Sequence, residues 1–347
     1  MRDTTPTNST DLTQRANQHI SDTLTIALQH DAKQRAIVVF DQRCELAVIL
    51  AAAYQHCLPD ARFIDFDQVT PDAVLAEFAQ LQPSDLVVLI QSTNFRLDAY
   101  RIRVELFKQH VKVIEHPHLA RMSDEQISFY IDALAYDPNY FRTVGRALKA
   151  RIDQAQCGEV DTGHGAKLHF ASPFESAKLN IGDYSDMTNV GGQFPIGEVF
   201  TEAQDLEAVH GKVRIFIFGD TSFTVNKPEQ AITLIVEKGR VVDVENSTPE
   251  FDLVLQKIRA DEGEVWLREL GFGMNRAFSV DRTVNDIGTY ERMCGIHLSL
   301  GAKHGVYTKP QIRRAEARYH VDVFAATETV SLDNEVIYRD GAWQVEC

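Results

Sequence analysis

The chain of 347 residues is too long for one core of ordinary size, so we expect two domains. Its 50 acidic residues against 35 basic ones give a formal net charge of −15, which disfavours nucleic acid or an anionic membrane surface as a main partner. A small molecule, a peptide or a bound cation fits this charge better.

Cysteine usage and the N-terminal sequence bear on the compartment. The five cysteines are scattered and include no Cys-x-x-Cys pair, which argues against a disulfide framework and a thiolate zinc site. The N-terminus lacks an apolar signal core, and no apolar run approaches the roughly 20 residues that span a bilayer. We therefore expect a cytoplasmic protein.

The first half alternates between helices and short apolar strands. Residues 1–10 are a predicted disordered tail, and apolar residues at every fourth position from Leu12 predict an amphipathic helix. Apolar runs predict strands at 36–40, 63–66, 86–90 and 111–114, separated by helices at 46–54, 71–80 and 97–109. This alternation predicts a Rossmann-like parallel α/β domain over residues 11–156. The absence of a Gly-x-Gly-x-x-Gly turn gives no support to a dinucleotide site.

Two further features mark the end of this half. Ser123 and Gln126 have the spacing of a capping box that opens a helix, and Pro138 separates this helix from the next.

Beyond about residue 157 the apolar and polar residues alternate, as in 167–170, 178–181 and 213–218, which predicts antiparallel strands. We expect a largely antiparallel β domain with helices over 157–347, with a hairpin around Lys238 and Gly239.

Candidate metal ligands lie in this second half. In a strand, His320 and Asp322 point to the same face, although a buried His–Asp hydrogen-bonded pair is the commoner explanation. His297, Glu269 and Glu198 each stand near glycine, where the backbone can approach a ligand closely. Each is weak alone. Together, imidazoles and carboxylates are the ligands that zinc, manganese, cobalt or ferrous iron bind.

Other histidines are less informative. His116 and His118 follow a strand end and could line a cleft, but a loop is the favoured interpretation. His164 stands between two glycines, which is typical of a turn.

Four motifs in the second half carry a resemblance. They are Gly-Glu-Val-Phe-Thr at 197–201, Glu-Leu-Gly-Phe-Gly-Met-Asn at 269–275, Gly-Ile-His-Leu-Ser-Leu-Gly at 295–301 and His-x-Asp at 320–322. In this order they resemble the thermophilic metallo-aminopeptidases (the M29 type), of which the chain looks like a divergent, short member. The likeness begins near residue 191 and covers about half the chain.

The resemblance implies a function and a site. It implies a homodimer that removes N-terminal residues from peptides, or cleaves a small amide, with two divalent ions such as Zn, Co or Mn. The residues that match the family's ligands are Glu198, Glu269, His297, His320 and Asp322. Glu198 and His304 are the expected catalytic residues, and His304 stands where the family usually has a tyrosine.

Two alternatives remain open. The 2,5-dihydroxypyridine ring-cleaving dioxygenases resemble the same family and use one Fe(II), for which His297, His320 and Asp322 could supply a two-histidine, one-carboxylate set. In that branch a histidine matches Glu269, so Glu269 favours the hydrolase. The third hypothesis is a catalytically altered binding or dimerisation module, which His304 keeps open.

Overall fold

The computed structural model describes residues 9–97 and 101–345, which form two compact units. The first unit runs to Pro138 and also contains Gly182–Ile196 and Val280–Asp286. The second contains Asn139–Ile181, Gly197–Ser279 and the chain from Ile287 onwards. The chain thus returns twice to the first unit, whereas the sequence suggested a single boundary near residue 156.

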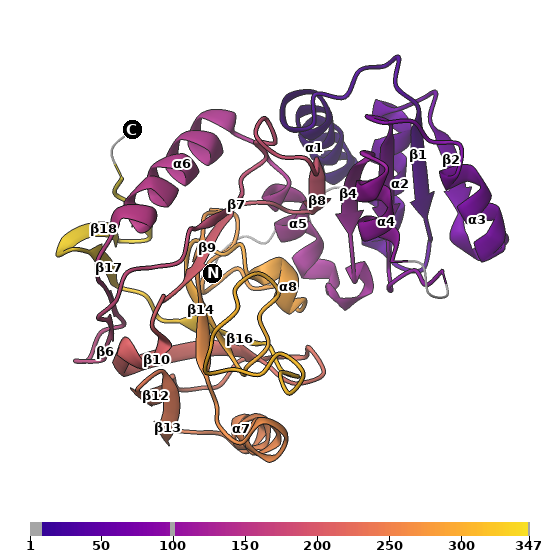
Figure 1. Cartoon of the computed structure of the whole chain (residues 1–347). Coiled ribbons are helices and arrows are strands. Elements are labelled where there is room, and N and C mark those ends of the chain that lie inside the picture. Colours follow the sequence, from indigo (N-terminus) through magenta and orange to yellow (C-terminus); the bar gives the residue numbers. More distant parts are fainter. Residues whose placement is uncertain (1–8, 98–100, 346–347) are drawn as a thin grey trace, which may run out of the picture. The chain divides into compact units, whose positions relative to one another are not determined.

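The first unit is built on a parallel sheet with the order β2-β1-β3-β4-β8 (Figure 1). The apolar runs fold as predicted because strands that are covered on both faces bury every residue, as β3 does. The strands are β1 (Ala36–Phe40), β2 (Arg62–Asp65), β3 (Leu86–Ile90), β4 (Lys112–His116) and β8 (Gly191–Gln193). The predicted Rossmann-like α/β layering is confirmed.

The helices of this unit follow the predicted positions. Helix α5 begins at the predicted capping box of Ser123 and Gln126. Helix α1 begins at Ser9, so residues 1–8 of the predicted tail lie outside the described residues, as do 98–100 of the predicted helix before α4. The helices are α1 (Ser9–Asp22), α2 (Glu45–Cys57), α3 (Pro71–Phe78), α4 (Ile102–Lys108) and α5 (Asp124–Ala133), with a π-turn at Thr23–Ala27 and 3-10 turns at Phe66–Gln68 and Leu119–Arg121.

His116 belongs to the core of this unit and not to a loop. It is the last residue of β4 and is buried, with Nε2 2.8 Å from the Tyr54 hydroxyl and Nδ1 2.8 Å from the Tyr130 hydroxyl. Tyr130 donates its own proton to the Phe194 carbonyl, so Nδ1–H donates to Tyr130 and Nε2 accepts from Tyr54. Burial lowers the pKa of His116 from 6.5 to about 3, which keeps the ring neutral.

The second unit is a large, mainly antiparallel sheet, as the alternating sequence predicts. Its main path is β19-β18-β17-β5-β6-β10-β16-β15-β14-β9-β7, and β11, β12 and β13 attach beside β10. The first strands are β5 (Gly158–Asp161), β6 (Lys167–Phe170), β7 (Lys178–Asn180), β9 (Glu198–Glu202), β10 (Val209–Gly219), β11 (Val225–Asn226), β12 (Ile232–Glu237) and β13 (Arg240–Glu245). The later ones are β14 (Leu267–Gly273), β15 (Gly295–Leu300), β16 (Val321–Ala325), β17 (Thr329–Leu332), β18 (Glu335–Arg339) and β19 (Ala342–Trp343).

Short connections and three helices complete this unit. The predicted hairpin joins β12 to β13, and Lys238 and Gly239 both have positive φ (48° and 72°), as a two-residue hairpin turn of the I′ type requires. The helices are α6 (Pro138–Gln154), α7 (Pro249–Glu262) and α8 (Ile287–Tyr290), with a 3-10 turn at Leu206–Ala208. Every residue of β14, β15 and β16 is buried, so any polar side chain there needs a partner.

In the described part of the chain, no helix has the length and apolar character needed to cross a membrane.

Candidate metal centre

Four adjacent strands of the second unit carry four of the five predicted ligands. Their order in the sheet is β16-β15-β14-β9, and they hold Asp322, His297, Glu269 and Glu198 respectively. His320 directly precedes β16. The strand pairing therefore brings together residues that are up to 124 positions apart in the sequence.

The first half of the centre is a buried triad. His297 Nε2 lies 3.2 Å from Glu198 Oε1 and 3.4 Å from Glu269 Oε1. Each of the three residues offers one ligand atom, and these atoms all lie within 4.8 Å of one another. Glu198, Glu269 and His297 could therefore hold a metal ion.

The second half gathers around the other oxygen of the same carboxylate. Glu269 Oε2 lies 2.9 Å from His304 Nε2 and 3.9 Å from His320 Nε2. His320 Nε2 is in turn 3.0 Å from Asp322 Oδ1. Glu269 thus stands between two groups of ligand atoms, and each of its oxygens faces one group.

Gly271 makes room for His297. The two residues are cross-strand partners of β14 and β15, and the imidazole lies directly over the glycine. A Cβ atom at position 271 would stand 2.0 Å from His297 Cε1 and 2.1 Å from Nε2, far inside van der Waals contact. The glycine of the Glu-Leu-Gly motif is therefore required by the close approach of the ring.

Backbone contacts fix which nitrogen of two histidines is free. His320 Nδ1 lies 3.1 Å from the Lys303 carbonyl, which can only accept, so this nitrogen carries a proton and Nε2 is the ring nitrogen that faces Asp322 and Glu269. His304 has the opposite arrangement. Its Nδ1 accepts from the backbone N–H groups of Val306 and Tyr307, so Nε2 carries the proton. His320 is thus arranged as a metal ligand and His304 as a hydrogen-bond donor.

Two buried polar atoms at the centre lack a hydrogen bond. They are Asp322 Oδ1 and His304 Nε2, and both have ionic neighbours without forming an aligned hydrogen bond. Buried polar atoms are normally satisfied, and one left in this way is explained by an ion, a water or a ligand that it faces. The donor set and Asp322 Oδ1 fit divalent cations, whereas the N–H group of His304 Nε2 fits a hydrogen-bond acceptor.

Arg292 and Glu291 belong to the same site, although neither was predicted from the sequence. The buried Arg292 Nη1 lies 2.9 Å from Glu198 Oε2 and 2.6 Å from Glu291 Oε2. This contact leaves Oε1 as the oxygen with which Glu198 faces His297. The two residues directly precede the Met-Cys-Gly-Ile-His run, and adjacent opposite charges before a buried strand were the signal that could have revealed them.

The site has a strongly negative potential. Burial would lower the pKa of His297, but hydrogen bonds to Glu198 and Glu269 outweigh it and hold that pKa well above 6.5. Burial would also lower the pKa of His320, but its interactions with Asp322, Glu269 and Glu291 together raise that pKa to about 10. Burial and the nearby Asp322 carboxylate raise the pKa of Glu291 well above its usual range. An environment that favours added protons in this way also favours metal cations.

A buried ion pair anchors the segment that carries His304. Arg268 makes a two-pronged contact with Glu202, with Nε–Oε2 2.7 Å and Nη2–Oε1 2.9 Å. The same guanidinium donates to the carbonyls of Ala302 and Tyr307, which bracket His304 in the sequence. The position of His304 is therefore tied to β14, the strand of Glu269.

Comparisons with known proteins bear on the fold. No protein-family model matches the sequence, and neither does any curated protein. Among solved structures, 2,5-dihydroxypyridine dioxygenase from Pseudomonas putida KT2440 matches with a TM-score of 0.63 and 14% identity, over 97% of this chain and 98% of that one. AmpT from Thermus thermophilus, a thermophilic M29 aminopeptidase, matches with a TM-score of 0.58 and 13% identity, over 96% and 99% of the two chains. The predicted resemblance is thus confirmed at the level of the fold, which this chain shares with the aminopeptidase AmpT and with the ring-cleaving dioxygenase.

Proposed function

We propose that this chain is a metal-dependent hydrolase of the aminopeptidase type, acting on small peptides or amides with two divalent ions. The observation that supports it is the position of Glu269, whose two oxygens face His297 on one side and His320 on the other. In this arrangement Glu198 and His297 would hold one ion together with Glu269, and His320 and Asp322 would hold the other. A carboxylate shared in this way reduces the repulsion between two cations.

The local charge favours bound cations. Glu198, Glu269 and Asp322 bring three buried carboxylates to the site, against the buried guanidinium of Arg292. Without metal, added protons on His297 and His320 offset the remaining negative charge, and metal cations would take the place of these protons. When bound, two divalent ions supply Lewis acidity towards a carbonyl and lower the pKa of a water molecule.

The protein's own groups orient the site. Arg292 holds one oxygen of Glu198, and the Lys303 carbonyl fixes the tautomer of His320. We assign His304 the role of a donor to the substrate carbonyl oxygen through Nε2–H, because its Nδ1 is occupied by two backbone N–H groups. A tyrosine at this position would also present a single donor, so the replacement preserves the hydrogen bond. Glu198 remains our candidate for the carboxylate that manages protons.

The dioxygenase is the second candidate function. Its solved structure gives the higher TM-score of the two neighbours, and a single Fe(II) could use His297, His320 and Asp322. Glu269 argues against this candidate, since a buried carboxylate between the two histidines adds a ligand that a single-iron site of that type does not need. The two candidates therefore differ in ion number.

Metal content and activity distinguish the two candidates. The chain would be reconstituted with Zn²⁺, Co²⁺ or Mn²⁺ in air, and with Fe²⁺ under anaerobic conditions, and the bound ions counted. A panel of amino-acid amides and dipeptides would be compared with 2,5-dihydroxypyridine, for which oxygen consumption is followed. Glu269→Gln tests the shared carboxylate, and Glu316→Gln, at an exposed ion pair with Arg313, is its matched control.

The hydrolase predicts two ions per chain, hydrolysis of the amide panel, and loss of one ion in Glu269→Gln but not in Glu316→Gln. One iron per chain with oxygen uptake would establish the dioxygenase instead. If the purified chain bound no stoichiometric divalent ion, both proposals would fail and a binding module would remain.

A further inference from the structure

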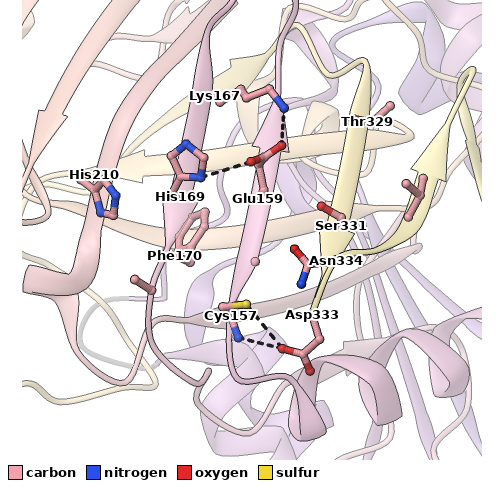
Figure 2. A pocket seen from close by; sticks show the side chains of 13 residues that line it. Cys157, Glu159, Lys167, His169, Phe170, His210, Thr329, Ser331, Asp333 and Asn334 are labelled. Atoms are coloured by element: carbon pink, nitrogen blue, oxygen red, sulfur yellow. Dashed lines mark hydrogen bonds and ion pairs between the residues drawn. The ribbon is translucent and has the colours of Figure 1, made fainter.

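A second pair of histidines lies in the same unit, outside the residues of the metal centre. His169 on β6 and His210 on β10 line an open groove of about 520 Å³, together with Glu159 on β5 (Figure 2). None of these residues was singled out by the sequence, since His169 and His210 stand 41 positions apart. The groove is polar, and the two imidazoles are its candidate metal ligands.

Strand register places the three side chains in one row. His210 is the cross-strand partner of His169, and His169 is the partner of Glu159. Directly opposed residues of antiparallel strands point to the same face of the sheet. The two imidazole rings accordingly lie nearly parallel, at an interplanar angle of 27°, with their centroids 5.4 Å apart.

In both histidines the Nδ1 atom already faces an acceptor. His169 Nδ1 lies 3.2 Å from Glu159 Oε2, and His210 Nδ1 lies 3.4 Å from the carbonyl of Ala208. A carboxylate and a carbonyl can only accept, so in the neutral rings Nδ1 carries the proton and Nε2 presents its lone pair. Metal-binding histidines are oriented in this way, with the other ring nitrogen donating to a carboxylate or a carbonyl.

The surrounding charge admits a cation. Lys167 lines the same groove, and its ammonium lies 2.7 Å from Glu159 Oε1 and 3.3 Å from Asp161 Oδ2. Two carboxylates therefore offset this one positive charge. Glu159 is at the same time held on both sides, by Lys167 and by His169, which fixes the carboxylate that orients the imidazole.

We propose that His169 and His210 form a second cation site, which binds one late first-row divalent ion such as Zn²⁺ or Ni²⁺ through both Nε2 atoms. Imidazole suits these ions, and solvent completes the coordination because His210 is exposed and His169 is partly exposed. Glu159 is the positioning residue of this site. The proposal does not rest on the proposed function of the buried centre.

Titration with Ni²⁺ tests the site in the full chain, prepared without a histidine tag. Calorimetry would give the number and affinity of bound ions, and paramagnetic broadening of histidine ring signals would identify the residues near Ni²⁺. The variants are His169→Ala, His210→Ala and Glu159→Gln. The matched control is His164→Ala, which removes an exposed histidine from the same unit.

We expect either histidine variant to lose one bound Ni²⁺ per chain, and Glu159→Gln to bind it about 10-fold to 100-fold more weakly. The control should match the wild type. In His297→Ala, which alters the buried centre, broadening at His169 and His210 should persist, so failure of one site is distinguishable from failure of the other. Equal Ni²⁺ stoichiometry and affinity in His210→Ala and the wild type would overturn the proposal.

Discussion

Gly271 offers a test of the metal centre that leaves every proposed ligand in place. In Gly271→Ala the new Cβ would lie 2.0 Å from His297 Cε1, whereas ordinary contacts begin at 3.4 Å. The ring must therefore move by at least about 1.0 Å to clear the 3.0 Å below which Cβ contacts essentially never occur, and by about 1.4 Å to reach ordinary contact. Neighbouring strands confine His297, so the ring cannot move away without changing its distances to Glu198 and Glu269.

The expected effect on metal binding is large and the effect on the fold is small. Metal–ligand distances tolerate only about 0.2 Å, and displacing a positioned group by about 1 Å can cost about 100-fold. We therefore expect the ion held by Glu198 and His297 to bind at least about 100-fold more weakly. Overpacking costs about 1–3 kcal/mol, partly offset because alanine is favoured over glycine in a strand. The fold should survive.

Gly305→Ala is the matched control for this experiment. Gly305 follows His304, its φ is not in the left-handed region, and an added Cβ would meet no atom within 4 Å. Both variants and the wild type would be titrated with Zn²⁺ against a chromophoric chelator. Their thermal unfolding would be compared by circular dichroism.

Metal affinity should fall in Gly271→Ala and not in Gly305→Ala. If this variant bound two ions as tightly as the wild type, His297 would not be a ligand in the observed position. If both glycine variants lost metal equally, the loss would reflect the loop or the preparation and not the contact with His297.

Three further predictions concern single residues. His304→Phe should lower kcat for an amide substrate about 100-fold to 1,000-fold with unchanged ion content, because a donor is lost, whereas His304→Tyr should retain activity; equal losses would refute the donor role. Arg268→Met should lower the free energy of unfolding by about 3–5 kcal/mol, measured by denaturant titration, because Glu202 stays buried without its main partner. The pKa of His116 is about 3 in the fold against 6.5 when unfolded, so stability is lost as pH falls below 6.5, by about 2 kcal/mol at pH 5. This extra pH slope should be absent in His116→Asn, and an identical slope would refute it.

The fold could be predicted where each segment's own sequence determines its structure. The apolar runs of β1, β3 and β4 are buried on both faces, and continuous hydrophobicity signals this directly. Strand β8 was missed because Gly191–Gln193 has no apolar run and becomes a strand only by pairing with β4. The division of the chain between two units depends on such distant contacts, and local periodicity carries no information about them.

The resemblance of their motifs to those of a family led us to expect that the five predicted ligand residues lie together, and they do; their role as ligands stays a prediction. Spacing alone supported only the pair His320 and Asp322, whose facing atoms do lie 3.0 Å apart. Arg292 was missed because a charged residue before a strand is ordinarily exposed, and here it is buried against Glu198. The pairing of His169 with His210 depends on the register of β6 and β10, which the sequence does not reveal.

His304 illustrates how backbone geometry can decide the chemistry of a side chain. A histidine offers either a donor or a lone pair at Nε2, and the residue name does not tell which. Here the N–H groups of Val306 and Tyr307 both point to Nδ1, so Nε2 is left as a donor. The carbonyls of Ala302 and Tyr307 bind Arg268, and this contact holds the loop in the conformation that presents those N–H groups. Two backbone hydrogen bonds therefore make His304 a substitute for tyrosine and not a third imidazole ligand. The buried Arg268 supports the loop that makes these two bonds.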